Sequence, residues 1–297
     1  MKKVFILGSL NMDMVIESPV LPEKGETVKG SGFMMNPGGK GANQAVACAR
    51  LGGVVKMAGC VGGDLFGKDL IKTLNEAGVD TSSIRTVTAS PTGVAVILII
   101  DRDNRIIIDE GANARVIEED VDNLLSEAGE GDIFLTQLEN PVKIIGYALK
   151  KAKEKGLYTI LNPAPANLEI IEYLPYVDLF IPNETEFMVF TGDDDLENSG
   201  KKIFSLGAKE LVVTLGSKGY CHLYREGIEY GSCPKVEAVD TTAAGDTFCG
   251  ALAAELSIGS ALKDALRFAT KAASIAVTAK GAQSSIPDRK KVESFKF

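Results

Sequence analysis

The sequence predicts an α/β protein whose mostly parallel sheet is covered by helices. Short β-branched runs alternate with longer helical patterns along most of the chain, which is typical of parallel strands joined by crossover helices. Two further stretches, residues 26–35 and 94–108, read as strands with no helix between paired halves, which indicates a small separate sheet. The 297 residues are 45% hydrophobic and contain no obvious linker, so one large domain with a small β insertion fits best.

The first two thirds of the chain supply most of the alternation. The expected strands there are 4–9, 54–61, 133–137, 157–162 and 178–183, and the expected helices are 39–51, 65–77 and 142–154. Within the strand-like stretch 94–108, Asp101-Arg102-Asp103-Asn104 has the composition of a hairpin turn.

From residue 211 the pattern changes to strand, turn, strand over 211–224, followed by a further strand at 229–234. Two apolar helices are expected after it, at 245–256 and 261–279. Little structure is expected beyond Pro287.

Composition excludes several classes of protein. Lys and Arg number 32 against 40 Asp and Glu, a net charge of −8, and no basic block interrupts the chain, which argues against a nucleic-acid surface. The longest apolar run, 94–100, is far shorter than the roughly 20 residues of a membrane-spanning helix. The five cysteines form an odd set without CxxC spacing, as expected of reduced thiols, so we expect a cytoplasmic protein.

Some features that suggest other functions have simpler interpretations. Residues 62–69 nearly form a GxxxxGK loop, but Asp69 stands where a hydroxyl would meet magnesium, so we expect a turn in which Asp64 caps the next helix. The acidic run 193–195 is expected to be a solvated turn that opens a helix. The single histidine, His222, has no His or Cys neighbour in its segment and is expected to be a strand residue. No GxGxxG follows the first strand, which removes the main support for a dinucleotide-dependent dehydrogenase.

The first segment with chemical meaning is GGKGANQAVACARLG at residues 38–52. Its glycines allow backbone amides to approach a ligand closely. Lys40 and Asn43 lie in the first turn of the expected helix, where they can reach a hydroxylated ligand. By itself the segment is equally compatible with an ordinary glycine-rich helix start.

The second segment is DTTAAGDTFCGA at residues 240–251. It places small residues and then Asp246 at the start of an apolar helix, where N–H groups and the helix dipole collect. A transferring phosphoryl group needs such donors, and the attacking hydroxyl needs a base in line with it. Asp246 is the natural base. The alternative is that Asp246 only caps its helix.

Together the two segments resemble the two signature motifs of the ribokinase (PfkB) family of carbohydrate kinases, in the same order along the chain. The resemblance extends through NMD at 11–13, QLE at 137–139, NPAPA from 162, PNETE from 182, TLGSKG from 214 and KGAQ from 280. It implies a three-layer α/β/α fold forming a single catalytic domain over 1–297, with a β lid built from approximately 10–37 and 94–109. It also implies transfer of phosphate from ATP to the 5-hydroxyl of D-ribose, and a homodimer formed through the lid.

The resemblance further implies where the sugar and the phosphates bind. The residues that match the family's sugar-binding positions are Asn11, Asp13, Gly39, Lys40, Asn43, Glu139 and Asp246. Carboxylates, amides and an ammonium group suit vicinal hydroxyls, which they can bond in pairs. Asp246 also matches the catalytic base, and the amides of Ala243, Ala244 and Gly245 match the anion hole. Much of the family has glycine at the place of Ala243, so a positive φ there would count against the hole.

The nucleotide and the metal ions are assigned in the same way. The residues that match the nucleotide site are Asn183, Thr214, Gly216, Gly219, Gly245 and Thr270. Glu186, three residues after Asn183, matches the position that orders the Mg²⁺ shell, and Mg²⁺ needs few protein ligands because it keeps several waters. A K⁺ site that activates the enzyme is implied at Asp240, Thr242, Ala276, Ala279, Gly281 and Ser285.

Two other functions stay open at this stage. The chain could phosphorylate another sugar or a nucleoside, or it could be a sugar-binding regulator that has lost catalysis. A base behind an anion hole argues against the regulator, which would have no use for Asp246 in that position. The decisive question is whether Asp246 faces the polar residues supplied by the opposite end of the chain.

Overall fold

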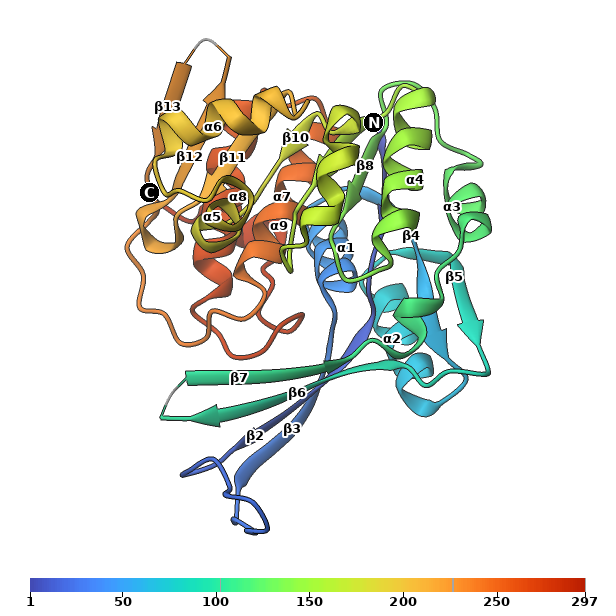
Figure 1. Cartoon of the computed structure of the whole chain (residues 1–297), viewed down its shortest axis with the longest axis vertical. Helices are drawn as coiled ribbons and strands as arrows, with labels where there is room; N and C mark the ends of the chain where they lie inside the picture. The colour runs from blue at the N-terminus through green and yellow to red at the C-terminus, as the bar shows by residue number, and fades with distance from the viewer. Residues whose placement is uncertain (102, 226, 297) are drawn as a thin grey trace.

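A sheet of nine strands lies at the centre of the residues that the computed structural model describes, 1–101, 103–225 and 227–296 (Figure 1). In spatial order the strands are β13 (Gly227–Gly231), β12 (Tyr220–Tyr224), β11 (Glu210–Thr214), β10 (Leu179–Phe180), β9 (Tyr158–Leu161), β8 (Ile133–Thr136), β1 (Lys3–Leu7), β4 (Val54–Gly62) and β5 (Asp80–Val87). Neighbouring strands from β11 to β5 pair in parallel, whereas β12 and β13 form an antiparallel extension at one edge. The predicted mostly parallel sheet is confirmed.

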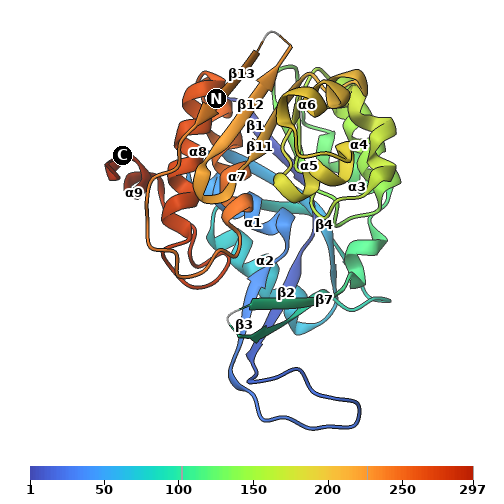
Figure 2. The same ribbon diagram turned by 60° about the vertical axis from the view of Figure 1, so that its left-hand side comes forward.

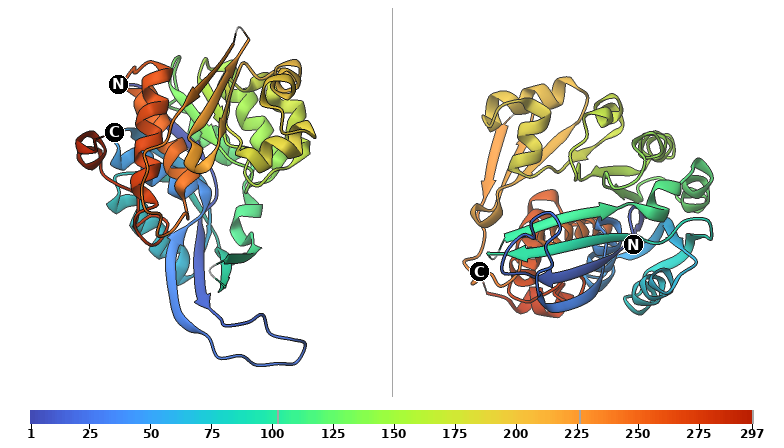
Figure 3. Two further views of the ribbon diagram at one scale, coloured as in Figure 1. Left: turned by 90° about the vertical axis from the view of Figure 1, so that its left-hand side faces the viewer. Right: turned by 60° about the horizontal axis from the view of Figure 1, so that its bottom comes forward.

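Helices cover both faces of this sheet because successive residues of a strand point to opposite faces. In β1, Val4 and Ile6 belong to one buried core, and Phe5 and Leu7 belong to the other. The first core is covered by α1 (Lys40–Arg50), α2 (Leu65–Glu76), α7 (Ala244–Ser257), α8 (Leu262–Ala276) and α9 (Arg289–Ser294). The second is covered by α3 (Glu118–Leu125), α4 (Val142–Glu154), α5 (Glu184–Thr191), α6 (Leu196–Ser205) and the 3-10 helix η2 (Leu168–Tyr176). The two helical layers are seen on either side of the sheet in the left view of Figure 3.

A second, smaller sheet projects from one end of the large one (Figure 2). Within the described residues its strands follow the order β3 (Ser31–Gly38), β2 (Asn11–Glu17), β6 (Gly93–Ile100) and β7 (Asp103–Asp109). β2 and β6 pair in parallel, and the outer strands pair with them antiparallel. We refer to these four strands as the small sheet. Short 3-10 helices η1 (Gly111–Arg115) and η3 (Gly216–Lys218) complete the elements used below.

The small sheet differs in detail from the sequence expectation. The strand predicted at 26–35 begins only at Ser31, because pairing with β2 ends where Glu17 lies opposite Ser31 and earlier residues have no partner strand. The hairpin expected after 94–100 is confirmed by Ile100 lying opposite Asp103. Arg102, which belonged to the predicted turn, lies outside the described residues.

The sequence expectation lacked strand β5 and helices α3, η2 and α9. Strand β5 escaped prediction because DTSSIRTV lies at the sheet edge and is largely polar. The expectation of little structure beyond Pro287 was wrong. Asp288 caps α9 by accepting a hydrogen bond from the Lys291 amide, and Arg289 binds the carbonyl of Leu51 and the carboxylate of Glu255. These long-range contacts leave no local sequence pattern.

The features interpreted as structural are confirmed in that role. Asp64 accepts a hydrogen bond from the Gly67 amide and caps α2, and Asp195 caps α6. His222 lies in β12, where its Nε2 is 2.9 Å from the carboxylate of Glu210. The five cysteines are free thiols, and none of the described helices is long and apolar enough to cross a membrane.

Candidate active site

The predicted site residues gather at the carboxyl edge of the large parallel sheet. Asn11 follows β1, Glu139 follows β8, Asn183 follows β10, and Thr214 is the last residue of β11. The chain runs from β1 outward to β4 in one direction and from β8 to β11 in the other, so the strand order reverses between β1 and β8. Ligands of open α/β sheets bind outside the carboxyl ends of the strands at such a reversal.

The two signature segments meet at this edge. Asn43, on α1, donates from Nδ2 to Oδ2 of Asp246, on α7, over 3.0 Å, although the two residues are 203 positions apart in sequence. The helices pack closely because α7 has glycine at the contact, where a Cβ on Gly250 would lie 2.4 Å from the carbonyl oxygen of Gln44. Within the described residues, the hydrogen bonds to the Asp246 carboxylate come from side chains of α1, not from the backbone of α7. Its carboxylate therefore serves the contact with α1.

Asn43 has one polar atom left for a ligand. Its Oδ1 is buried and has no hydrogen-bond partner within the described residues, and the whole residue is 5% exposed. A buried acceptor without a donor costs free energy unless something else satisfies it. A hydroxyl group next to Asp246 would do so.

The loop between β1 and β2 lies directly against the start of α1. Gly39 adopts φ 90, and a Cβ there would lie 2.7 Å from the amide nitrogen of Asn11, so only glycine fits. Glu139 joins these segments, since its Oε2 accepts hydrogen bonds from the Ser9 hydroxyl and from the Lys40 amide, the latter at 3.2 Å.

The charged groups of the site affect one another. Burial, together with the nearby Glu139 and Asp246, raises the pKa of the Asp13 carboxyl to about 7, while Lys40 opposes that shift. Burial lowers the pKa of Lys40, but Asp246, Glu139 and Glu186 outweigh that effect and leave the pKa above its ordinary value. Burial also raises the pKa of Glu186. One ammonium group thus lies among four carboxyl groups.

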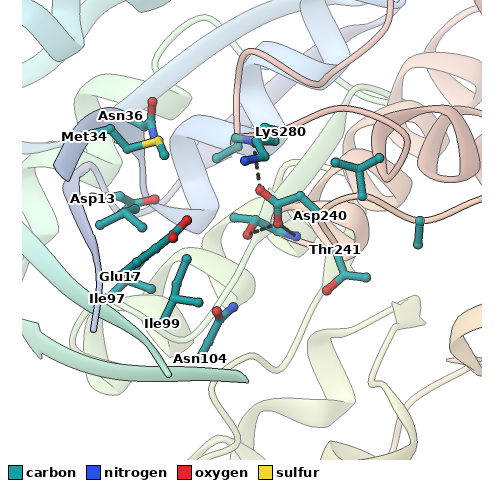
Figure 4. Close-up of a pocket in the computed structure, with 16 residues that line it drawn as sticks. Asp13, Glu17, Met34, Asn36, Ile97, Ile99, Asn104, Asp240, Thr241 and Lys280 are labelled. Carbon is teal, nitrogen blue, oxygen red and sulfur yellow. Dashed lines mark hydrogen bonds between the residues drawn. The ribbon is translucent and has the colours of Figure 1, made fainter. Parts of the chain in front are cut away.

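A cavity of about 470 Å³ separates the small sheet from the loop that begins at Ala238 (Figure 4). Asp13, Asn36 and Ile97 reach it from the small sheet, and Asp240 and Lys280 reach it from the other side. The lining combines apolar side chains such as Ile97 with charged ones such as Asp240 and Lys280, which suits a small polyhydroxylated molecule. Of the residues predicted for the sugar, Asp13 is the one found in the described lining.

A second cavity of about 540 Å³ adjoins the first, and the two share Ala238 and Thr241. Five of the six residues predicted for the nucleotide line it: Thr214, Gly216, Gly219, Gly245 and Thr270. The sixth, Asn183, forms a parallel bridge with Thr214 at the rim. Apolar residues such as Phe248 and Val277 complete the lining, which suits the flat face of a heterocyclic base.

Comparison with known proteins agrees with this arrangement. The profile of the pfkB family of carbohydrate kinases matches residues 1–289. The chain belongs to this family. It is 40% identical to a ribokinase from Haemophilus influenzae, over 99% of this chain and 98% of the relative, and 39% identical to a ribokinase from Schizosaccharomyces pombe, over 99% and 97%.

Solved structures of the family give the same result. A ribokinase from Thermotoga maritima superposes with a TM-score of 0.89 at 39% identity, covering 99% of both chains. An Arabidopsis thaliana ribokinase, solved in complex with ribose and ATP, superposes with a TM-score of 0.89 at 34% identity and the same coverage. The predicted family and the ribokinase-like α/β fold are confirmed.

The family's anion-hole segment has one unexpected feature here. Ala243 adopts φ 57, a left-handed conformation that costs an alanine about 1 kcal/mol relative to glycine. The Ala244 amide donates to the Thr241 carbonyl over 3.2 Å, whereas the amides of Ala243 and Gly245 have no acceptor within the described residues. A Cβ built on Gly245 meets no atom within 4 Å, so the space in front of this turn is open. Positive φ at Ala243 is the condition that counted against the hole, yet two amides of the segment remain available as donors.

The residues matched to metal ions lie in two places. Glu186 and Asn183 form a capping box at the start of α5, with the Glu186 carboxylate accepting from the Asn183 amide over 2.9 Å. Asp240 accepts hydrogen bonds from Thr242 and from the Gly281 amide, and these outweigh its burial and lower its pKa. No cluster of three or more His, Cys, Asp or Glu side chains able to hold a metal ion occurs among residues 1–101, 103–225 and 227–296.

Sequence reasoning missed several buried amide side chains around the site. Asn113, in η1, is 1% exposed and donates to the Oδ1 of Asn11 over 2.7 Å, which leaves the Nδ2 of Asn11 free to face a ligand. Gln44, the residue after Asn43, donates to Oδ1 of Asp246 over 3.0 Å. The only available signal was the grouping of Lys40, Asn43 and Gln44 at helical spacing on one turn.

Proposed function

We propose that this chain transfers the γ-phosphoryl group of ATP to the 5-hydroxyl of D-ribose, giving D-ribose 5-phosphate and ADP. The observation that carries the proposal is the contact between Asp246 and Asn43, which joins the predicted base to the predicted hydroxyl-binding segment. The relatives named above are ribokinases, and one of them was solved with ribose and ATP. The two adjoining cavities offer room for one sugar and one nucleotide.

The sugar would lie beside Asp13, which lines the cavity under the small sheet and is close enough to Glu139, Asp246 and Lys40 for their charges to act on its pKa. In this proposal Asp13, Asn11 and Glu139 bond the ring hydroxyls, and the Oδ1 of Asn43 accepts a hydrogen bond from a hydroxyl next to the reacting one. The primary hydroxyl then points at Asp246, whose carboxylate is already fixed by α1. Lys40 balances part of the negative charge that the substrates bring into the site.

Asp246 takes the proton of the 5-hydroxyl as that oxygen attacks the γ-phosphorus. The amides of Ala243 and Gly245 and the N-terminal end of α7 donate toward the charge on the transferred group. ATP lies in the second cavity, with its base between the turn at Gly216 and helix α8 and its phosphates toward Gly245.

Two ions complete the proposal. Glu186 would hold Mg²⁺ mainly through water, which fits a single carboxylate at the phosphate end of the site, and the ion would neutralise charge on the phosphates. K⁺ would bind among Asp240, Ser285 and carbonyls of Thr242, Ala276, Ala279 and Gly281. Asp240 would supply the negative charge of this set, since burial is outweighed by hydrogen bonds from Thr242 and Gly281 and by the charge of Lys280, which leave its pKa below the ordinary value. Its loop carries the anion-hole amides, so the ion would hold them in place.

We also propose that two copies associate through the small sheet. Its strands expose large apolar side chains, namely Phe33, Met35, Ile106, Ile107 and Ile108, with Ile107 67% exposed. Apolar side chains gathered in this way on a surface mark an interaction site. The expected compartment is the cytoplasm, where the thiols stay reduced.

A coupled assay for ADP release on a panel of acceptors tests the proposal. We expect turnover with D-ribose, Mg²⁺ and ATP that exceeds turnover with 2-deoxyribose or adenosine, and stimulation by K⁺. Absence of ribose-dependent ADP release under these conditions overturns the proposed reaction. Preference for adenosine indicates a nucleoside kinase, and sugar binding without any turnover indicates a regulator.

A further inference from the structure

The predicted catalytic carboxylate is held by two amide side chains of α1. Asn43 donates to Oδ2 of Asp246, and its own Oδ1 has no hydrogen-bond partner within the described residues. Gln44 donates from Nε2 to Oδ1 of Asp246 over 3.0 Å and is fully buried. Gln44 is 0% exposed, whereas Asn43 is 5% exposed and Asp246 is 7% exposed. Gln44 therefore contacts the predicted base from inside the protein and has no surface of its own open to a ligand.

Gln44 belongs to a connected row of buried amides behind Asp246. The Nε2 of Gln44 also donates to the Oδ1 of Asn162, 3.1 Å away, and its Oε1 accepts from the Nε2 of Gln137 at 2.6 Å. Asn162 in turn donates from Nδ2 to the carbonyl of Ile181 over 2.9 Å. Gln137 and Asn162 follow the carboxyl ends of β8 and β9, so the sheet itself positions this row.

The direction of every amide in the row is determined. An ionised carboxylate can only accept, so the NH₂ end of Gln44 must face Asp246 and its oxygen must face Gln137. The Ile181 carbonyl can also only accept, which forces the Asn162 oxygen toward Gln44. If the Gln44 amide were rotated by half a turn, its oxygen would face Oδ1 of Asp246 and Oδ1 of Asn162. Because Asp246 at one end of the row and the Ile181 carbonyl at the other can only accept, the amides between them have one favourable arrangement.

The row is also closed by packing. Gln137 is 1% exposed, and a Cβ on Gly8, at the end of β1, would lie 2.4 Å from its Oε1. Glycine at this point lets the Gln137 side chain lie against the β1 backbone. The amides cannot leave the row for solvent.

We propose that Gln44 is a positioning residue for the phosphoryl transfer: together with Gln137 and Asn162 it orients the Asp246 carboxylate toward the sugar's primary hydroxyl. This inference rests on the proposed function, because it assigns Gln44 a role through the base of that reaction. The hydrogen bond from Gln44 sets the orientation of the Asp246 carboxylate but does not contact the sugar. Its loss should therefore lower turnover more than it weakens ribose binding. Gln44→Met, which keeps the length and removes the amide, is expected to lower kcat about 10- to 100-fold with little change in the Kd for ribose.

Gln44→Glu supplies a readout that a purely structural role does not move. The introduced carboxyl can donate to Asp246 only while it is protonated, and once ionised it repels the Asp246 carboxylate. The ratio of variant to wild-type kcat should therefore fall as pH rises from about 6 to about 9. A packing defect lowers kcat by the same factor across that range.

Val46→Ala is the matched control. Val46 is fully buried on the same helix and belongs to the apolar core. The truncation should lower the unfolding temperature and leave kcat and its pH profile close to wild type, because it removes no group that touches Asp246. Thermal unfolding and ribose titration calorimetry on each variant separate loss of folding from loss of turnover.

The outcomes separate this inference from the proposed function. A wild-type chain without ribose-dependent turnover overturns the proposed reaction and, with it, the role of Gln44. An active wild type with normal kcat in Gln44→Met overturns the inference alone. If Gln44→Met fails to fold, Gln44→Glu decides, since it keeps the size and shape of the native side chain. A folded Gln44→Glu variant whose kcat parallels wild type at every pH contradicts the inference.

Discussion

The two walls of the active site are built in opposite ways. On one side, α1 and α7 pack with almost every residue of their contact buried, and Asp246 is held there by side chains 202 and 203 positions away in sequence. On the other side, the small sheet is a single layer in which β7 is exposed along its whole length. The first wall is part of the protein core and the second is a projection from it. The difference indicates that Asp246, the proposed base, is in place before substrate binds, whereas the small sheet, the proposed cover over the sugar, depends on further contacts.

Among changes in the wall formed by α1 and α7, replacing the proposed base should have the largest effect on turnover. Asp246→Asn keeps the size of the side chain, but an amide cannot take up the proton, and its NH₂ group replaces one of the two oxygens that accept hydrogen bonds from α1. We expect kcat to fall about 10²- to 10⁴-fold while ribose still binds. Steady-state kinetics and ribose calorimetry measure the two quantities. Asp264→Asn, an exposed acid in the first turn of α8, should match wild type. Near-normal turnover of the Asp246 variant would show that another group is the base.

The second largest effect is expected when α1 is forced away from α7. A Cβ on Gly250 would lie 2.4 Å from the Gln44 carbonyl and 2.6 Å from the Ala47 side chain, so Gly250→Ala must push α1 away from α7. We expect a loss of about 2 kcal/mol in the free energy of unfolding. A fall in kcat of roughly tenfold or more should accompany it, because Asn43 and Gln44 no longer reach Asp246.

Denaturant unfolding and kinetics on the same samples test this coupling. Gly129→Ala is the control, since a Cβ there meets nothing closer than 3.9 Å. Full activity in Gly250→Ala, together with the expected loss of stability, would argue that the close contact of the helices does not matter for turnover.

These two predictions concern the part of the site that the sequence located well. Both signature segments were found because glycines and polar residues open helices there, and glycine lowers helix stability, so its presence at a helix start points to a close backbone approach. The amides behind Asp246 were missed because Gln44 looks like any polar helical residue, and its partners Gln137 and Asn162 come from distant strands. Strand β5 and helix α9 were missed for the same reason, since edge pairing and the contacts of Arg289 depend on tertiary structure. The left-handed Ala243 could not be predicted because alanine rarely adopts that conformation.

A smaller effect should appear at Asp13, where the two walls meet. The pKa of this carboxyl rises from 3.8 to about 7, through burial and the charges of Glu139 and Asp246, with Lys40 opposing them. The folded chain therefore binds its proton more tightly than the unfolded chain, and stability falls as pH rises from about 4 to about 7. Asp13→Asn should stabilise the protein, with a gain that grows over this range and is constant above it, and should raise the KM for ribose about tenfold or more.

Thermal unfolding at several pH values and ribose kinetics measure both effects. Asp103→Asn, on exposed β7 of the same sheet, should change neither quantity. A gain in stability that does not vary with pH would contradict the assigned titration of Asp13.

The smallest effect on the stability of the chain is expected for substitutions at exposed positions of the small sheet. Ile107→Asp places a charge on a side chain that is 67% exposed, so folding should be unaffected while association of two copies weakens. Sedimentation velocity over a range of concentrations measures the oligomer. Leu65→Asp, at a residue 73% exposed on α2, is the matched control and should leave association unchanged. Equal association of both variants and wild type would argue that the small sheet is not the contact surface.

The most direct test of the proposed geometry is a crystal structure of this chain with ribose and a non-hydrolysable ATP analogue. We expect the sugar's primary hydroxyl within about 3 Å of the Asp246 carboxylate, on the line toward the γ-phosphorus, with Asn43 and Gln44 still bonded to that carboxylate. A sugar bound with its primary hydroxyl pointing away from Asp246, toward the small sheet, would contradict it.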